Sequence, residues 1–167
     1  MKTFKLIILF LLGSLIVEAC PPPTGHLVID VQAMWNPIEY NMCSEPSLNG
    51  TGAQFAIGYE IPKRAYKVYA SGQYRYGNKW SVGLLQKVEL LPLFSGSPVV
   101  PEFTLNVGYD YRNCAYLRPG IELSFGRSGS FAKFLIRYEA GCIFPNGNSI
   151  FDHNLMIGLE FWIGKCW

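Results

Sequence analysis

From about residue 27 onwards, apolar and polar residues alternate along the chain with a period of two. A β-strand has this period, because successive side chains point to opposite faces of a sheet. In one regular segment, Phe103 and Leu105 fall on one face while Glu102 and Thr104 fall on the other. Eight such segments follow one another, at 27–36, 54–61, 66–76, 80–90, 102–112, 117–125, 132–141 and 155–164. The pattern therefore predicts an all-β protein of eight strands.

The connections between these segments favour an antiparallel order. Residues 62–65, 77–78, 112–113 and 126–129 have the composition of hairpin turns. Two longer connections, 37–52 and 145–154, are rich in Asn, Gly, Pro and Ser, and a third, 91–101, is interrupted by proline. Alternation of this kind fits a membrane barrel and also a soluble lipocalin-like binder, so the position of the charges has to decide between them.

The charged residues gather on one of the two faces, and on the other face we find only Lys165, at the end of the chain. Acids and bases on the charged face are nearly equal in number and are mixed with Gly and Ser, which suits a narrow lumen because an unpaired buried charge is costly. Aromatic residues lie near the strand ends of the apolar face, where interfacial girdles sit. The charged-face residues are Asp30, Glu60, Glu89, Glu102, Asp110, Glu122, Glu139, Glu160, Lys67, Arg75, Lys87, Arg112, Arg118, Lys133 and Arg137.

This distribution predicts that the apolar face is turned towards lipid and the charged face towards the inside. A sheet in hydrocarbon must pair every backbone amide, so it has to close on itself. Eight segments of about ten residues suffice to cross a bilayer when tilted. We therefore expect an eight-stranded antiparallel up-and-down transmembrane β-barrel.

The N-terminus has the pattern of a secretory signal peptide. Lys2 and Lys5 precede an apolar run at residues 6–17, and the small residue Ala19 follows it. The run is too short for a membrane-spanning helix. We expect residues 1–19 to be the signal peptide and residues 20–167 to form the outer-membrane barrel domain.

The cysteines allow several arrangements. Cys20 is either the lipidated first residue of a lipoprotein, tethered by the prolines that follow it, or an ordinary thiol or disulfide partner. In an oxidising compartment disulfides are the natural interpretation, with Cys43 pairing either Cys114 or Cys142, and Cys20 pairing Cys166. Their spacing does not suit zinc.

Composition removes other classes of function. Charged residues make up 16% of the chain and the formal net charge is +2, without the clustered basic face that nucleic-acid binding needs. The sequence indicates no cofactor and no metal site.

The chain resembles the small outer-membrane barrels of the OmpX and OmpA transmembrane type over nearly its whole mature length. Its last segment is similar to the C-terminal signal that the barrel assembly machinery selects, with Leu159, Phe161, Ile163 and Trp167 matching and Lys165 departing. The resemblance implies residence in the bacterial outer membrane and contact with outer-membrane lipid and the assembly machinery. As an accessory subunit, such a protein would also contact other outer-membrane proteins in a complex.

Eight strands leave an interior that side chains fill, so we expect a lumen ion-pair network rather than a wide pore. The residues expected in it are Asp30, Glu60, Arg75, Glu122, Arg137, Glu139 and Glu160. Such a barrel would be a structural, accessory or binding subunit that acts through its loops, 37–52 and 145–154 outside and 91–101 inside, and not an enzyme.

The alternative is an outer-membrane lipid-modifying enzyme of the lipid A deacylase or palmitoyltransferase type. Such an enzyme needs a histidine with a hydroxyl nucleophile and a carboxylate. His153, Ser149 and Asp152 are the candidates for these roles.

Overall fold

The structure is a computed structural model. It describes residues 26–35, 39–41, 51–61, 66–76, 79–90, 98–126, 131–144 and 150–163, and nearly all of these residues lie in antiparallel strands. No helix within those ranges is long and apolar enough to cross a membrane. The strands are β1 (His26–Trp35), β2 (Glu39–Asn41), β3 (Thr51–Ile61), β4 (Tyr66–Arg75), β5 (Lys79–Glu89), β6 (Val99–Asp110), β7 (Ala115–Phe125), β8 (Ala132–Phe144) and β9 (Ile150–Ile163).

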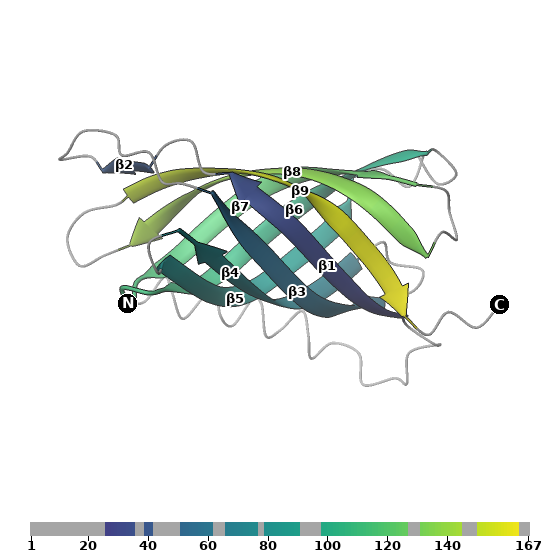
Figure 1. Ribbon diagram of the computed structural model, residues 1–167, viewed down its shortest axis with the longest axis horizontal. Coiled ribbons are helices and arrows are strands. Elements are labelled where there is room, and N and C mark those ends of the chain that lie inside the picture. Colours follow the sequence, from purple (N-terminus) through teal and green to yellow (C-terminus); the bar gives the residue numbers. More distant parts are fainter. Residues whose placement is uncertain are drawn as a thin grey trace.

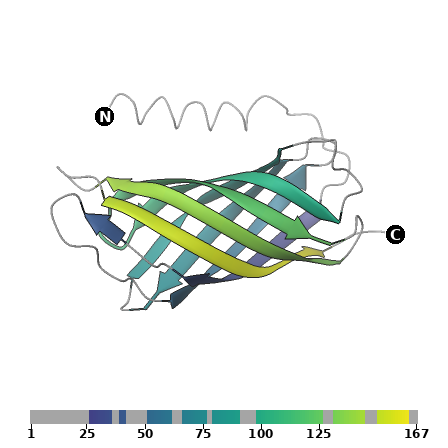
Figure 2. The ribbon, with the colours of Figure 1, turned by 90° about the horizontal axis from the view of Figure 1, so that it is seen from above.

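The eight long strands close into a barrel. From β1 through β3 to β9, each long strand pairs with the next one, and β1 also pairs with β9, where Asp30 lies opposite Glu160. Figures 1 and 2 show the strands running obliquely around the long axis, with β1 beside β9 at the seam. The short β2 adds to the start of β9. The predicted eight-stranded antiparallel up-and-down barrel is confirmed.

The burial of side chains agrees with the prediction that the apolar face is turned outwards and the charged face inwards. On β7, Ile121 is 55% exposed, whereas its neighbour Glu122 is fully buried, as is Arg137 opposite it on β8. Lumen-facing positions are thus mostly polar or charged and buried, and the outward ones are mostly apolar and exposed. A soluble lipocalin-like barrel has the reverse arrangement, because its apolar side chains must leave water.

Three of the expected connections prove to be partly strand. The expected loop 145–154 is wrong over 150–154, because β9 begins at Ile150 and pairs there with Ile143 of β8. The expected connection 91–101 is wrong over 99–101, because β6 begins at Val99. The expected loop 37–52 contains β2 and the first two residues of β3. Polar and apolar residues do not alternate regularly at these strand ends, so the sequence pattern alone does not identify them as strand.

Candidate functional site in the barrel lumen

The lumen is lined by every second residue of each strand, and its polar lining is buried. Because the pleat turns alternate side chains inwards, acids, bases and amides from all eight long strands meet around one axis. The fully or nearly fully buried ionisable residues among them are Asp30, Lys67, Arg75, Lys87, Glu102, Asp110, Arg118, Glu122, Arg137, Glu139, Asp152 and Glu160.

Two lysines and one arginine hold together the larger of two charged clusters in the lumen. The Lys87 ammonium lies 2.8 Å from Asp30, 2.7 Å from Glu122 and 2.8 Å from Glu160.

The Lys67 ammonium lies 2.9 Å from Glu102 and 2.7 Å from Glu160, and the Tyr69 hydroxyl donates to Glu160 at 2.6 Å. Arg137 donates to Glu122 at 2.6 Å and to Glu139 at 3.3 Å, and also pairs with Asp30. Each of these contacts crosses the lumen or joins neighbouring inward residues.

The strand register places like charges directly opposite each other in this cluster. Lys67 of β4 is the cross-strand partner of Lys87 of β5, and Glu102 of β6 is the partner of Glu122 of β7. Like charges in such positions destabilise a strand pair. The ammoniums of this first hairpin bind the carboxylates of the second, and both ammoniums also bind Glu160 of β9, so the two like-charged pairs neutralise each other.

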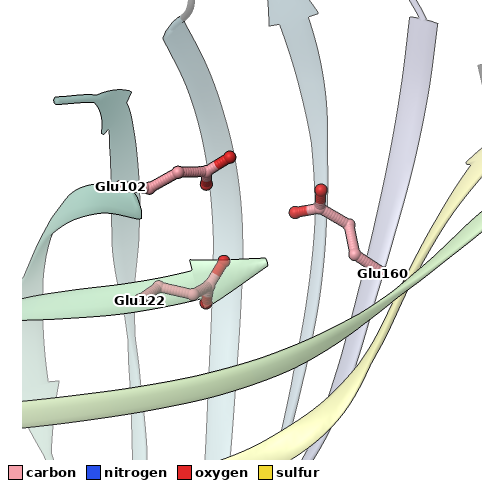
Figure 3. A group of neighbouring side chains, drawn as sticks. All are labelled: Glu102, Glu122 and Glu160. Atoms are coloured by element: carbon pink, nitrogen blue, oxygen red, sulfur yellow. The ribbon is translucent and has the colours of Figure 1, made fainter. Parts of the chain in front are cut away.

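Three carboxylates of this cluster have the spacing of metal ligands. Oxygens of Glu102, Glu122 and Glu160 all lie within 4.8 Å of one another, and Figure 3 shows the three side chains reaching into the barrel from different strands. However, Lys87 bridges two of them and Lys67 also bridges two. The positive charge that the carboxylates require is therefore supplied by the chain itself.

A second cluster lies towards the end of the barrel where β4, β6 and β8 finish and β5, β7 and β9 begin, which we call the mouth. Asp152 accepts hydrogen bonds from Arg75 at 3.0 Å and from Arg118 at 3.0 and 3.1 Å. Arg112 of the β6–β7 turn donates to Asp110 at 2.7 Å. Amides and hydroxyls, among them Gln73, Ser81 and Asn106, fill the space between the two clusters.

An apolar layer accompanies the charges. Val28, Ala56, Tyr69, Leu85 and Trp162 pack together inside the barrel. The Trp162 indole donates to Glu60 at 2.7 Å. With side chains packed along its length, the lumen is suited to holding the barrel rigid rather than to conducting solutes.

Six of the seven residues expected in the lumen network make ion pairs there, and Glu60 instead accepts the bond from Trp162. Sequence reasoning placed Lys67, Lys87, Glu102 and Arg118 on the charged face without choosing them as network members. It assigned Asp152 to a loop, although Asp152 continues the even-numbered inward series of Asn154 and Glu160. This even-numbered spacing is the signal in the sequence that could have placed Asp152 in the lumen.

The two described residues of the enzyme alternative, Asp152 and His153, lie on opposite faces of β9. Asp152 points into the lumen, whereas His153 lies on the outer side of β9 with its Nδ1 2.6 Å from the Tyr138 hydroxyl. Ser149 lies outside the described residues.

The remaining expected residues fall partly outside the described ranges. Cys114 and Cys142 are half-buried free thiols. Cys20, Cys43 and Cys166 are not among the described residues, so lipidation and the disulfides stay predictions. Of the expected assembly signal, Phe161 and Ile163 face outwards on β9, and Trp167 is not described.

Comparison with known proteins gives structural similarity alone. No family model matches the sequence, and no curated protein matches it. The crystal structure of Neisserial surface protein A is similar, with a TM-score of 0.63 and 12% identity over 83% of this chain and 99% of that one. The fold is that of a small bacterial outer-membrane β-barrel.

Two further structures are similar to this barrel. One comes from work on the de novo design of transmembrane β-barrels, with a TM-score of 0.55 and 12% identity over 87% of this chain and 100% of that one. The other is Ail, the attachment invasion locus protein of Yersinia pestis, with a TM-score of 0.46 and 14% identity over 82% of this chain and 97% of that one.

Proposed function

We propose that the protein is a non-enzymatic outer-membrane barrel that serves as a rigid anchor and binds a partner at its mouth. The observation that carries this proposal is the buried, ion-paired lumen: Lys87 and Arg137 are fully buried and both bind the fully buried Glu122. A lumen filled in this way leaves the two ends of the barrel as the surfaces that can meet other molecules.

The mouth is the better of the two ends for such contacts. The segments 42–50 and 145–149 connect strands there, and both are rich in residues typical of binding loops. Loops held by a rigid scaffold are the usual carriers of recognition. We propose that the partner is another outer-membrane protein, and that the outer face meets lipid and, during insertion, the barrel assembly machinery.

Copurification in mild detergent tests this proposal. We compare the native chain with a variant whose residues 145–149 are replaced by a Gly-Ser linker, and with a matched control in which residues 91–97, at the opposite end, are replaced. The proposal predicts that associated proteins are lost from the first variant and kept by the control. Recovery of a lone barrel from native membranes, or equal loss in both variants, would contradict it.

The enzyme alternative has its own experiment. The native chain and a His153→Ala variant are expressed in an outer membrane, and lipid A is analysed by mass spectrometry. A non-enzymatic barrel leaves lipid A unchanged in both strains. A lipid A species that appears with the native chain and disappears with His153→Ala would replace our proposal by the enzyme.

A further inference from the structure

A broad apolar hollow lies on the outer face of the barrel, over strands β1, β3 and β4, which are side by side in Figure 1. It lies towards the end of the barrel opposite the mouth, which we call the base, where β1 and β4 begin and β3 ends. Its free volume is about 380 Å³, within the range of clefts that bind small molecules. The residues that line it are Leu27, Ile57, Gly58, Tyr59, Ile61 and Val68.

One polar side chain borders this hollow. The strand register places Leu27, Tyr59 and Val68 on a single cross-strand rung, and the next residue on that rung is Gln86 of β5, directly opposite Val68. The Cβ atoms of residues paired in this way lie within about 5.5 Å of each other. The half-buried Gln86 is therefore a neighbour of the hollow on the same outer face.

The amide of Gln86 offers hydrogen-bond donors on a face that meets lipid. Its Oε1 accepts from the Tyr66 hydroxyl at 2.8 Å, and within the described part of the chain this is the one hydrogen bond of the Gln86 side chain. The amide nitrogen carries two N–H donors. Such donors need an acceptor in a bilayer, where water does not reach the hydrocarbon.

The depth of Gln86 narrows the choice of acceptor. Gln86 lies three residues before the end of β5 at the base, which is about 10 Å along the strand. This position is nearer to the interface than to the bilayer midplane. The ester carbonyls of a glycerophospholipid lie at the interface, accept hydrogen bonds and adjoin two acyl chains.

We propose that the hollow and Gln86 together bind one glycerophospholipid, with an acyl chain in the hollow and an ester carbonyl at the Gln86 amide. The proposal rests on the proposed contact of the outer face with lipid, and it adds the class of lipid and the residues that select it. We expect the base on the periplasmic side, because the long loops lie at the mouth, and the leaflet there consists of phospholipids. The phosphate headgroup stays outside the apolar hollow, at the rim of the base.

Native mass spectrometry of the folded barrel in a sugar-based detergent tests this site. The barrel is titrated with dioleoylphosphatidylethanolamine and with its diether analogue, which has the same headgroup but no ester carbonyls. We expect the first lipid to bind about fivefold more weakly when it is the diether, because one hydrogen bond is lost. Gln86→Leu should bind the ester lipid as weakly as the native barrel binds the diether, and should not distinguish the two lipids.

A second variant tests the hollow itself. Val68→Trp fills it and should weaken the binding of both lipids. Leu123→Trp is the matched control, because Leu123 is also on the outer face and is the third residue from the base end of β7, as Val68 is of β4. The control should bind both lipids like the native chain.

Several outcomes would overturn the site: equal affinity of the native barrel for the two lipids, a native preference for the ester in Gln86→Leu, or equal weakening by Leu123→Trp. Tighter binding of lipid A, or a dimer that Val68→Trp dissociates, would assign the hollow to another occupant. A partner that copurifies with a barrel lacking this lipid preference would refute the inference and leave the proposed function standing. The lipid preference without a copurifying partner would do the reverse.

Discussion

At the scale of single residues, Arg137 shows how the charges of the lumen depend on one another. Its guanidinium is fully buried and binds Glu122, Glu139 and Asp30. Removing one partner of a buried ion pair leaves the other charges without compensation, which is the costly case.

We predict that Arg137→Met lowers the free energy of unfolding by about 3–5 kcal/mol. Arg112→Met at the mouth removes a partly exposed arginine, and Asp110 keeps the hydrogen bonds from the backbone amides of residue 112 and Cys114, so this substitution should cost no more than about 1 kcal/mol. Urea-induced unfolding in lipid vesicles measures both. Equal effects of the two substitutions would mean that the lumen network does not stabilise the barrel.

Glycines make room for the large side chains of the lumen. Gly83 and Gly108 face each other across β5 and β6, and a Cβ on Gly83 would overlap the Tyr116 hydroxyl and the Val107 carbonyl oxygen. Gly72 points outwards, and a Cβ there meets nothing within 4 Å.

We therefore predict that Gly83→Ala destabilises the barrel by about 1–3 kcal/mol through overpacking. Gly72→Ala should be neutral or slightly stabilising, because glycine in a strand costs conformational entropy. The same unfolding assay in vesicles compares them. A Gly83→Ala variant as stable as Gly72→Ala would show that Tyr116 does not fill the space above β5.

At the scale of elements, the middle of each strand's outer face lies near the bilayer midplane, and its two ends lie near the interfaces. Ile121 lies in the middle of β7, and Phe144 is the last residue of β8; both are exposed. An arginine on the lipid face is expensive at the bilayer midplane and cheap near the interface.

Ile121→Arg should therefore destabilise the barrel by about 2–4 kcal/mol, and Phe144→Arg by about 0–1 kcal/mol. Refolding into vesicles, followed by urea titration, gives both values. An outer face in contact with water would tolerate the two substitutions equally, and this result would contradict the lipid-facing position of these residues.

The elements also show how far the sequence alone leads. Period-two alternation was enough for the eight long strands and their faces, since a one-residue shift would invert every side chain. It did not account for Leu85 and Gln86 on β5, which break the pattern. Leu85 belongs to an apolar layer inside the lumen, and the Gln86 amide accepts from the Tyr66 hydroxyl on the neighbouring strand.

Contacts across the lumen could not be predicted in the same way. Which ammonium reaches which carboxylate depends on the register of all eight long strands at once, and the sequence does not contain that register in readable form. Asp152 is an example. Its residue type suggests a loop residue or a catalytic acid, but in the structure it is an anion of the lumen, between Arg75 and Arg118. The position of Asp152 in the lumen therefore depends on how the strands close into a barrel and not on the local sequence pattern.

At the scale of the whole molecule, the filled lumen predicts a barrel that does not conduct. In planar lipid bilayers the native chain should give no steady channels at moderate voltage, because buried side chains occupy its axis. Single-channel recording measures this directly. Stable conductance of porin size would contradict the filled lumen and with it the anchoring role.

The central claim is the inversion of the barrel, with apolar side chains towards lipid and the charged network inside. Leu84 and Leu85 are neighbours on β5, yet Leu84 is 41% exposed on the outer face and Leu85 is fully buried. Methyl-labelled protein in lipid nanodiscs, examined for nuclear Overhauser contacts with acyl-chain protons, separates the two faces without any substitution. The account predicts strong acyl-chain contacts at the methyl groups of Leu84 and Ile121 and none at Leu85. Acyl-chain contacts at Leu85 with water contacts at Leu84 would contradict it.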